Sequence, residues 1–366
     1  MKAFVTGGSG FIGQQVIRKL IQRGDDVYAL ARSPQSGDIV ANLGATVVRG
    51  DITDTASMRE GMAGSDVVFH IAAWYQFGGG EEAAAKADAI NVGGTRNVLR
   101  LAYELAIPKI VYTSSIIIFG NTAGEMADEN FYQGAPFASE YARTKWLAHY
   151  KVALPLIEKG APIVIVQPSA VYGPGDTSEI IETMMRQFYR GLPIIVGSDT
   201  VYSYVHVDDV AEGHLLAAER GTVGESYILT GPSIPLGEMV DFWAYLLGRS
   251  RPIVRVRGKY VQPLAPIVNA AAAHLPLPPF FNGEMISMAG TTYIARADKA
   301  KAELGWETRP LQTGMLETFE WIAATEAERD AYHIAHHTRE KKLAATAIIS
   351  AGLLFGAWLF AGRRKK

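Results

Sequence analysis

The first half of the chain alternates short apolar, β-branched runs with segments in which apolar residues recur every three or four positions. Six runs have the length and composition of strands, and helical patterns follow most of them; the runs are 2–7, 26–32, 45–52, 65–73, 109–115 and 162–173. This alternation predicts an α/β protein with a parallel, doubly wound Rossmann sheet that carries helices on both faces.

The pattern changes after residue 175, where proline and loop residues become more frequent. We expect residues 1–175 and about 201–222 to form the Rossmann domain. A smaller, interleaved C-terminal substrate domain is expected from about 176–200 and 223–325. A polar linker helix is predicted at 326–343.

The C-terminal segment 344–361 contains 18 residues without a charge, and basic residues flank it on both sides. As a helix it would span about 27 Å, close to the roughly 30 Å hydrocarbon core of a bilayer. We therefore predict a transmembrane anchor; a buried core helix or an oligomerisation helix is the alternative. Gly352 and Gly356 have a spacing that supports helix pairing, which leaves a homodimer open.

Composition excludes several classes of function. A net charge of −2 without a concentrated basic face gives no basis for nucleic-acid binding, and we expect no nucleic-acid partner. The chain has no cysteine, which rules out disulfides and cysteine-based metal centres. We expect no bound metal. The 48% apolar content is that of a globular protein with a full core.

The segment "TGGSGFIG" follows the first predicted strand and opens a helix. It places Gly7, Gly10 and Gly13 three residues apart, with Phe11 and Ile12 between the last two. Glycines at these positions permit a tight turn, close approach of a pyrophosphate to the backbone, and packing of the helix on the sheet. In this strand–turn–helix context the pattern predicts a dinucleotide-binding site.

The end of the second predicted strand bears on the choice of dinucleotide. It reads "ALARSP", with Arg32 where a carboxylate would accept the ribose 2′-hydroxyl of NAD. An arginine there accommodates the 2′-phosphate of NADP, so we expect NADP as the preferred cofactor, with NAD as the alternative. The other interpretation of Arg32 is a solvated loop residue.

The stretch "SEYARTKWLAHY" places Tyr141 and Lys145 on one face of a predicted helix. The spacing alone is common. Together with the glycine turn and "YTSS", however, it makes the chain resemble the extended short-chain dehydrogenase/reductase family, which includes NAD-dependent epimerases and dehydratases. The resemblance covers residues 1 to about 325. Within the family, the chain is most similar to the dihydroflavonol-reductase-like group, including hopanoid-associated sugar epimerases.

The resemblance implies roles for further motifs, "GDITD", "HIAA", "NVGGT" and "QPSAVYGPGD". The cofactor contacts that it implies beyond the glycine turn and Arg32 are Asp51, Ile52, Ala72, Ala73, Asn91, Tyr141, Lys145, Pro168 and Val171. One position departs from the family pattern, because Gln167 stands where many relatives have arginine. No role of that arginine can be carried over.

The resemblance also implies a catalytic set of Ser115, Tyr141 and Lys145. A tyrosine with a pKa near 10 is a poor base at neutral pH, and a neighbouring ammonium group is expected to lower that pKa. Lys145 lies one helical turn from Tyr141 and would also reach the nicotinamide ribose. Ser115 would hydrogen-bond the substrate oxygen.

Three functions remain open at this point. The first is hydride transfer to or from a secondary alcohol or ketone of a small, lipophilic substrate. The second is a nucleotide-sugar epimerase or dehydratase with retained NAD, for which Arg255, Arg257 and Lys259 could bind a diphosphate. The third is a non-catalytic scaffold that binds NADP. Because NADP is cytosolic, the catalytic part is expected in the cytoplasm, anchored to the membrane.

Other chemically suggestive residues have a structural interpretation beside a functional one. His206, Asp208 and Asp209 could form a catalytic or metal cluster, but we expect them to fix the chain where it returns to the sheet. His333, His336 and His337 have helical spacing without a matching carboxylate pattern. Aromatic residues that could line a substrate pocket or simply fill the core are Trp74, Tyr75, Phe77, Phe119, Tyr172 and Tyr204.

Overall fold

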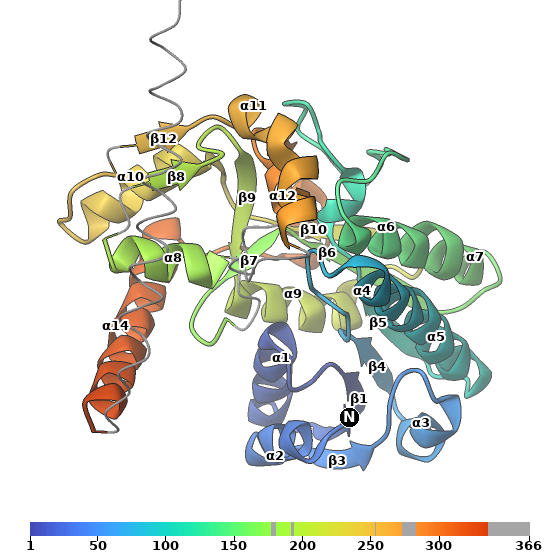
Figure 1. The fold of residues 1–366 in the computed structure, drawn as a ribbon. Coiled ribbons are helices and arrows are strands. Elements are labelled where there is room, and N and C mark those ends of the chain that lie inside the picture. Colours follow the sequence, from blue (N-terminus) through green and yellow to red (C-terminus); the bar gives the residue numbers. More distant parts are fainter. Residues whose placement is uncertain (177–180, 192–193, 253, 273–282, 336–366) are drawn as a thin grey trace, which may run out of the picture. The chain divides into compact units, whose positions relative to one another are not determined.

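The computed structural model describes residues 1–176, 181–191, 194–252, 254–272 and 283–335. Its centre is a parallel sheet of seven strands in the order β10-β6-β5-β4-β1-β2-β3 (Figure 1). The strands are β1 (Lys2–Thr6), β2 (Asp26–Ala31), β3 (Thr46–Arg49), β4 (Val67–His70), β5 (Lys109–Thr113), β6 (Ile163–Pro168) and β10 (Ser226–Leu229). The predicted doubly wound Rossmann sheet is confirmed.

Both faces of this sheet are covered, because strand residues alternate between two cores. Val5 packs into one core and its neighbour Phe4 into the other. The first core is closed by α1 (Phe11–Gln22), α2 (Pro34–Asn42) and α9 (Val207–Arg220). The second is closed by α3 (Thr55–Met62), α5 (Thr95–Glu104) and the continuous run η3 (Ala148–Ala153) and α7 (Leu154–Ile157), which follows α6 (Glu140–Leu147).

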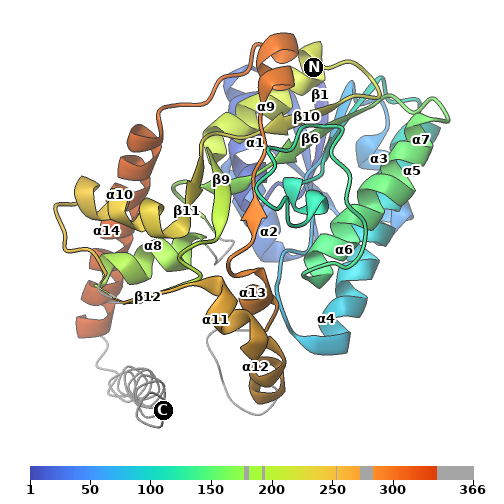
Figure 2. The same ribbon diagram turned by 90° about the horizontal axis from the view of Figure 1, so that it is seen from above.

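A second group of elements lies beside the carboxyl ends of the sheet strands (Figures 1 and 2). It contains a four-stranded sheet of β7 (Ala170–Tyr172), β9 (Val201–His206), β11 (Ser233–Pro235) and β13 (Thr292–Tyr293), and a two-stranded sheet of β8 (Ile194–Val196) and β12 (Val254–Val256). Its helices are α8 (Ile181–Tyr189), α10 (Leu236–Leu246), α11 (Gly258–Val261), η4 (Gln262–Leu264), α12 (Ala265–Ala272) and α13 (Gly283–Met288).

Several short elements connect these layers. After β4 come α4 (Gly80–Ala87) and the π-helical segment η1 (Asp88–Gly94), which runs into α5. A 3₁₀ turn, η2 (Ile116–Phe119), follows β5, and a π-helical turn, η5 (Ala300–Leu304), follows β13. The sequence pattern did not indicate α4, because its glycine- and alanine-rich segment has no apolar periodicity.

Strand pairing crosses the boundaries that were expected between the two domains. Residues 223–325 were assigned to the substrate domain, but β10 within them is the edge strand of the seven-stranded sheet, paired with β6. Conversely, β9 falls in the segment 201–222 assigned to the Rossmann domain, yet it belongs to the four-stranded sheet. The run 162–173 forms two strands in different sheets, β6 and β7, with Ser169 between them. Hydrophobic periodicity cannot distinguish these partners.

Residues 1–319 form one compact unit, and residues 320–366 form another. The helix α14 (Leu311–Ala335) begins in the first unit, so the linker helix predicted to start at residue 326 is the continuation of a helix that starts at Leu311. Among the described residues, none of the helices combines the length and apolar character needed to cross a bilayer. The anchor predicted at 344–361 lies outside the described residues, as do His336 and His337.

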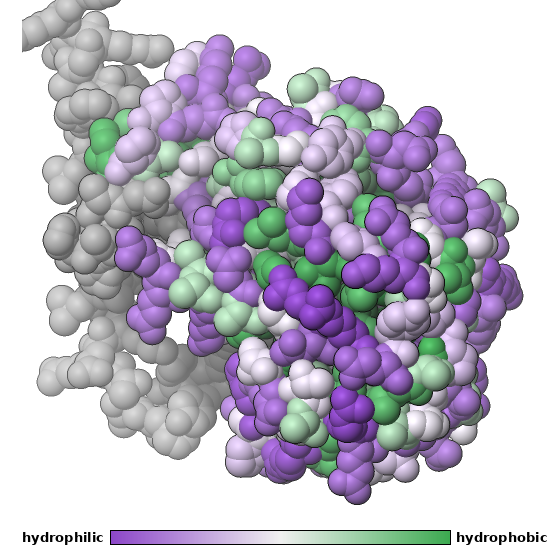
Figure 3. All heavy atoms as spheres, turned by 90° about the vertical axis from the view of Figure 1, so that its right-hand side faces the viewer, coloured by the Kyte–Doolittle hydropathy of each residue, from purple (hydrophilic) through white to green (hydrophobic). Residues whose placement is uncertain are grey.

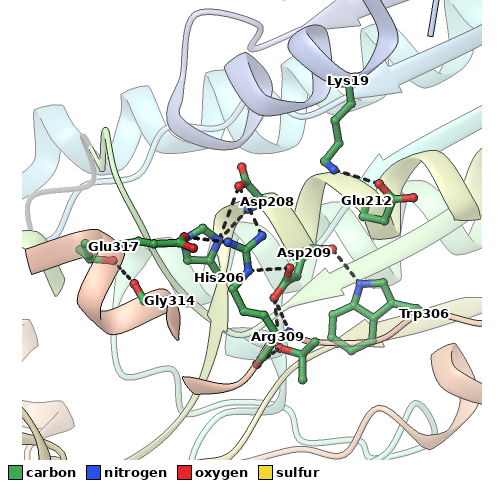
Figure 4. Close-up of polar contacts among 11 residues, drawn as sticks. Lys19, His206, Asp208, Asp209, Glu212, Trp306, Arg309, Gly314 and Glu317 are labelled. Carbon is green, nitrogen blue, oxygen red and sulfur yellow. Dashed lines mark hydrogen bonds and ion pairs between the residues drawn. The ribbon is translucent and has the colours of Figure 1, made fainter. Parts of the chain in front are cut away.

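A cluster of charged side chains fastens residues 306–317 to α9 (Figure 4). Arg309 contacts three carboxylates, those of Asp208 at 3.3 Å, Asp209 at 2.9 Å and Glu317 at 2.8 Å. His206 accepts the Asp208 backbone N–H at 3.2 Å and so caps α9. Arg309 occupies the centre of the cluster and pairs with each of the three carboxylates. The expected structural role fits this geometry.

No group of three or more histidine, aspartate or glutamate side chains with the geometry of a metal site occurs among the described residues.

One face of the protein, seen from the right of Figure 1, shows hydrophobic side chains in small groups separated by hydrophilic ones (Figure 3). This mixture is ordinary for a solvated surface.

Candidate active site

A cavity of about 590 Å³ opens at the carboxyl ends of the central strands, where ligands bind in doubly wound sheets. Its lining is continuous from the glycine turn after β1 to the helix that carries Tyr141. The predicted site residues that line it are Gly7, Gly10, Phe11, Ile12, Gly13, Arg32, Asp51, Ile52, Ala72, Ala73, Ser115, Tyr141, Lys145, Pro168 and Val171. One predicted residue, Asn91, does not.

The turn after β1 is compatible only with glycine at two positions. Gly7 has a φ of +76°, and a Cβ there would lie 2.5 Å from the backbone nitrogen of Ala72. A Cβ on Gly13 would lie 2.1 Å from the Gly7 carbonyl oxygen. Gly10 caps α1 without a side chain, so the first amides of this helix face the cavity uncovered. Such an amide cradle fits the pyrophosphate of a dinucleotide.

The edge of the cavity beyond α1 carries the residues expected near the adenosine. Arg32 is largely exposed, and its guanidinium lies 3.9 Å from the Asp51 carboxylate. The other carboxylate oxygen of Asp51 accepts the Thr53 backbone N–H and hydroxyl, each at 2.8 Å. Ser33 and Ser36 also line the cavity here and cap the start of α2. The site thus offers one cation and two hydroxyl groups next to the predicted ribose position.

At the opposite end, α6 presents Tyr141 and Lys145 to the cavity. The Lys145 ammonium donates to the Thr113 carbonyl oxygen at 2.7 Å, and burial lowers the pKa of Lys145 to about 7. Burial raises the pKa of Tyr141 above its ordinary value, and a hydrogen bond with Ser115 opposes this shift only in part. Desolvation of the phenol therefore sets the direction of the pKa shift in this structure, opposite to the lowering that was expected from Lys145.

Asn91 has a different role from the predicted one. It is buried, and its amide group accepts from the Trp74 backbone nitrogen at 2.6 Å and donates to the Trp74 carbonyl oxygen at 3.0 Å. It also donates to the Thr144 hydroxyl at 3.0 Å. The side chain ties the loop after β4 to α6, so it positions that loop. The prediction that Asn91 contacts the cofactor is not supported.

The histidine of "HIAA" is also buried beneath the cavity. His70 contacts the Thr6 hydroxyl at 2.8 Å through Nδ1 and the Thr95 hydroxyl at 2.9 Å through Nε2. Burial and the nearby charge of Lys145 lower the pKa of His70 to about 3. A neutral imidazole at this place joins β1, β4 and α5.

The wall around Tyr141 is aromatic. Tyr75 meets the Tyr141 ring edge-on, with centroids 4.7 Å apart, and the Phe77 ring lies 5.8 Å away. Trp74, Tyr75 and Phe77 all line the cavity, as the pocket interpretation expects. The other aromatic candidates do not line it and are buried in packing instead; they are Phe119, Tyr172 and Tyr204.

The remaining wall comes from segments that no sequence motif indicates. These lining residues are Ile116 and Ile117 of η2, Ile181 of α8, Tyr202 of β9, Met285 and Met288 of α13 and Tyr293 of β13. The rings of Tyr202 and Tyr293 stack with centroids 5.9 Å apart. No local motif marks such residues, because only the fold brings their elements to the cavity.

Comparisons with known proteins identify the family of this chain. The model of the family described as the NAD dependent epimerase/dehydratase family matches residues 3–229. A protein from Synechocystis sp., named as a dihydroflavonol 4-reductase, is 33% identical over 87% of this chain and 94% of its own length. This similarity confirms the resemblance to the dihydroflavonol-reductase-like group.

Two further proteins are similar over most of their length. The 4-hydroxy-2-methyl-3-oxo-4-farnesyl-3,4-dihydroquinoline-1-oxide ketoreductase of Stigmatella aurantiaca is 31% identical, covering 84% of this chain and 92% of its own. The crystal structure of gox2253 superposes with a TM-score of 0.75 at 32% identity, covering 88% of this chain and 98% of that one. The chain belongs to the NAD-dependent epimerase/dehydratase family and is an NAD(P)-dependent oxidoreductase of the short-chain dehydrogenase/reductase type.

Proposed function

We propose that the protein transfers hydride between NADP and a secondary alcohol or ketone of a small, lipophilic substrate, with Ser115, Tyr141 and Lys145 as the catalytic set. The observation that carries this proposal is the chemistry of the wall around Tyr141. It is built from aromatic rings, isoleucines and the methionines of α13. An apolar wall of this kind stabilises an apolar ligand by removing its surface from water.

The same wall argues against the nucleotide-sugar alternative. Among the described residues that line the cavity, the only cations are Arg32, at the adenosine end, and Lys145. The three cations considered for a diphosphate, Arg255, Arg257 and Lys259, do not line it. Arg255 instead pairs with the Asp241 carboxylate. Lys145 is thus the one cation at the substrate end among the described lining residues, and the proposed function assigns it to the nicotinamide ribose, so none of them is left for a diphosphate.

The chain's own groups suit the binding of the cofactor and the movement of a proton. The start of α1 would hold the pyrophosphate, Asp51 and Ile52 the adenine, and Lys145 the nicotinamide ribose. The cofactor supplies or accepts the hydride. In the reductive direction, Tyr141 donates its phenolic proton to the substrate oxygen while Ser115 hydrogen-bonds that oxygen. The presence of all three side chains in one cavity also argues against a non-catalytic scaffold.

The names of the relatives support a reductase over an epimerase. One is named as a dihydroflavonol 4-reductase and another as a ketoreductase of a farnesylated dihydroquinoline oxide. Both names describe reduction of an oxygenated ring compound, and the second compound carries an apolar chain.

Replacing Tyr141 by phenylalanine tests the proton transfer. We expect turnover of a lipophilic ketone to fall by about 10² to 10⁴, because only the hydroxyl is removed. Cofactor affinity should change by less than about threefold. Steady-state kinetics and cofactor titration measure the two effects. Tyr132→Phe, at an exposed tyrosine outside the cavity, is the matched control. Retained turnover in Tyr141→Phe would contradict the assignment.

The pKa of Lys145 predicts a pH dependence of stability. In the folded state the pKa is about 7, against 10.5 for an ordinary lysine. Between these values the unfolded chain binds a proton that the folded chain does not, so stability should rise with pH across this window. Relative to Lys145→Met, the free energy of unfolding should gain at most about 1.4 kcal/mol per pH unit. Denaturant unfolding of both proteins without cofactor, from pH 7 to 9, measures the difference; parallel profiles would refute it.

Arg32 is expected to select NADP through the 2′-phosphate. We predict that Arg32→Ala weakens NADP binding about 10- to 100-fold and leaves NAD binding nearly unchanged, because a charge-assisted contact contributes about 1.5–3 kcal/mol. Titration of both cofactors measures this. Arg18→Ala, at an exposed position of α1, should change neither affinity. An equal loss of affinity for both cofactors would show that Arg32 does not distinguish a 2′-phosphate from a 2′-hydroxyl.

We propose further that residues 344–361 anchor the protein in a membrane with the catalytic part in the cytoplasm. The uncharged segment and its flanking cations support this. We expect the full chain to fractionate with membranes and a chain ending at Ala335 to be released with its activity intact. Carbonate extraction and membrane flotation measure the distribution. A full chain that stays in the supernatant without detergent would overturn the anchor.

The homodimer stays a prediction from Gly352 and Gly356.

A further inference from the structure

The loop between β4 and α4 forms the aromatic wall over Tyr141, and it is held at both ends. At one end Asn91 binds both backbone groups of Trp74. At the other end the Gly78 backbone N–H donates to the Glu284 carboxylate at 2.8 Å. The rings of Tyr75 and Phe77, which contact Tyr141, lie between these two attachments.

Glu284 also reaches the helix that carries the catalytic tyrosine. Its second carboxylate oxygen accepts the Glu140 backbone N–H at 3.3 Å. Glu140 is the first residue of α6, so the carboxylate lies at the positive end of that helix, one residue before Tyr141. A single side chain therefore joins the loop, the start of α6 and α13.

The attachment at Gly78 is adjacent to an unusually permissive stretch of backbone. Gly78, Gly79 and Gly80 have φ values of 76°, 96° and 67°, a left-handed conformation that costs glycine little. Glycines also leave many other conformations open, so the backbone here does not fix the loop by itself. The hydrogen bond from Gly78 to Glu284 supplies the constraint that the glycines lack.

We propose that Glu284 is a positioning residue that fixes the aromatic wall against Tyr141 and thereby sets the preference for bulky apolar substrates. This inference rests on the proposed function. The neighbouring Met285 and Met288 on α13 line the same cavity. The carboxylate thus holds two sides of the substrate wall, the aromatic loop and the methionine helix, at a fixed separation from the reacting end.

A carboxylate suits this position better than a neutral side chain. It has two acceptor oxygens and no donor, and each oxygen serves one backbone N–H. Glutamine can accept through one oxygen and brings an NH₂ group against the second amide. Glu284→Gln should therefore lose one of the two contacts, and Glu284→Ala should lose both.

Hydrogen–deuterium exchange tests the contacts without reference to turnover. In Glu284→Ala we expect the Gly78 and Glu140 amides to exchange at least about tenfold faster, measured in peptides that cover 74–80 and 138–143. Glu284→Gln should give an intermediate rate. Glu125→Ala, at an exposed carboxylate, is the matched control and should leave both peptides unchanged. Unaltered exchange in both Glu284 variants would contradict the proposed role of the two Glu284 contacts, whether or not the enzyme reduces ketones.

Kinetics test the effect on the substrate. For a bulky apolar ketone, Glu284→Ala should raise KM about tenfold with kcat changed less than about threefold, and for a small ketone neither constant should change. If Glu284 acts through the loop, its effect should disappear when Phe77→Ala is already present. Additive effects, or a loss confined to kcat, would overturn the positioning role. If the wild type reduces no ketone, the proposed function fails. The exchange experiment still shows whether Glu284 holds the Gly78 and Glu140 amides.

Discussion

The site depends on the contact between Gly7 and the backbone of Ala72. No side chain fits there, because a Cβ on Gly7 would lie 2.5 Å from the Ala72 nitrogen. The segments that follow the carboxyl ends of β1 and β4 can therefore lie against each other. The His70 imidazole joins the ends of the two strands through its contact with the Thr6 hydroxyl. This contact places the start of α1 at the cavity. It also fixes where the chain leaves β4, and so where the aromatic loop begins.

The layer under the cavity concentrates buried titratable groups, yet only one of them titrates near neutral pH. Burial and the charge of Lys145 lower the pKa of both His70 and His149 to about 3, so both imidazoles stay neutral. They serve as hydrogen-bonding partners, His70 for threonine hydroxyls and His149 for the Ser114 hydroxyl at 3.0 Å. Lys145, with a pKa of about 7, is left as the group that can exchange a proton beside Tyr141.

Local spacing made part of this site predictable. The glycine turn and the Tyr141–Lys145 pair each lie within one turn or one helix, where the covalent chain sets the geometry. Asn91 shows the limit of a motif, because its amide binds the Trp74 backbone and Asn91 does not line the cavity. Gly78 and Glu284 are 206 residues apart, and no sequence pattern connects a backbone N–H to a distant carboxylate.

In the fold, too, local features could be predicted from the sequence and long-range pairings could not. The first six strands could be read from apolar runs, but β10 looks like any short strand until its pairing with β6 is known. The cavity wall from β9 and β13 depends on such a pairing, because the two strands lie side by side in the four-stranded sheet, and α13 directly precedes β13. The predicted cofactor-binding residues follow local rules in this chain, whereas the residues proposed to bind the substrate are brought together by long-range packing.

The apolar wall and the protonation of Tyr141 are linked by the burial of the Tyr141 ring. Tyr75 and Phe77 pack against the Tyr141 ring, and the burial that results raises the pKa of its phenol. A phenol with a raised pKa is protonated at neutral pH, and the protonated form is the one that donates to a ketone oxygen in the reductive direction. A polar wall shaped for a diphosphate would hydrate the phenol and weaken this effect. On the proposed function, the residues that admit an apolar substrate therefore also keep Tyr141 in its protonated form.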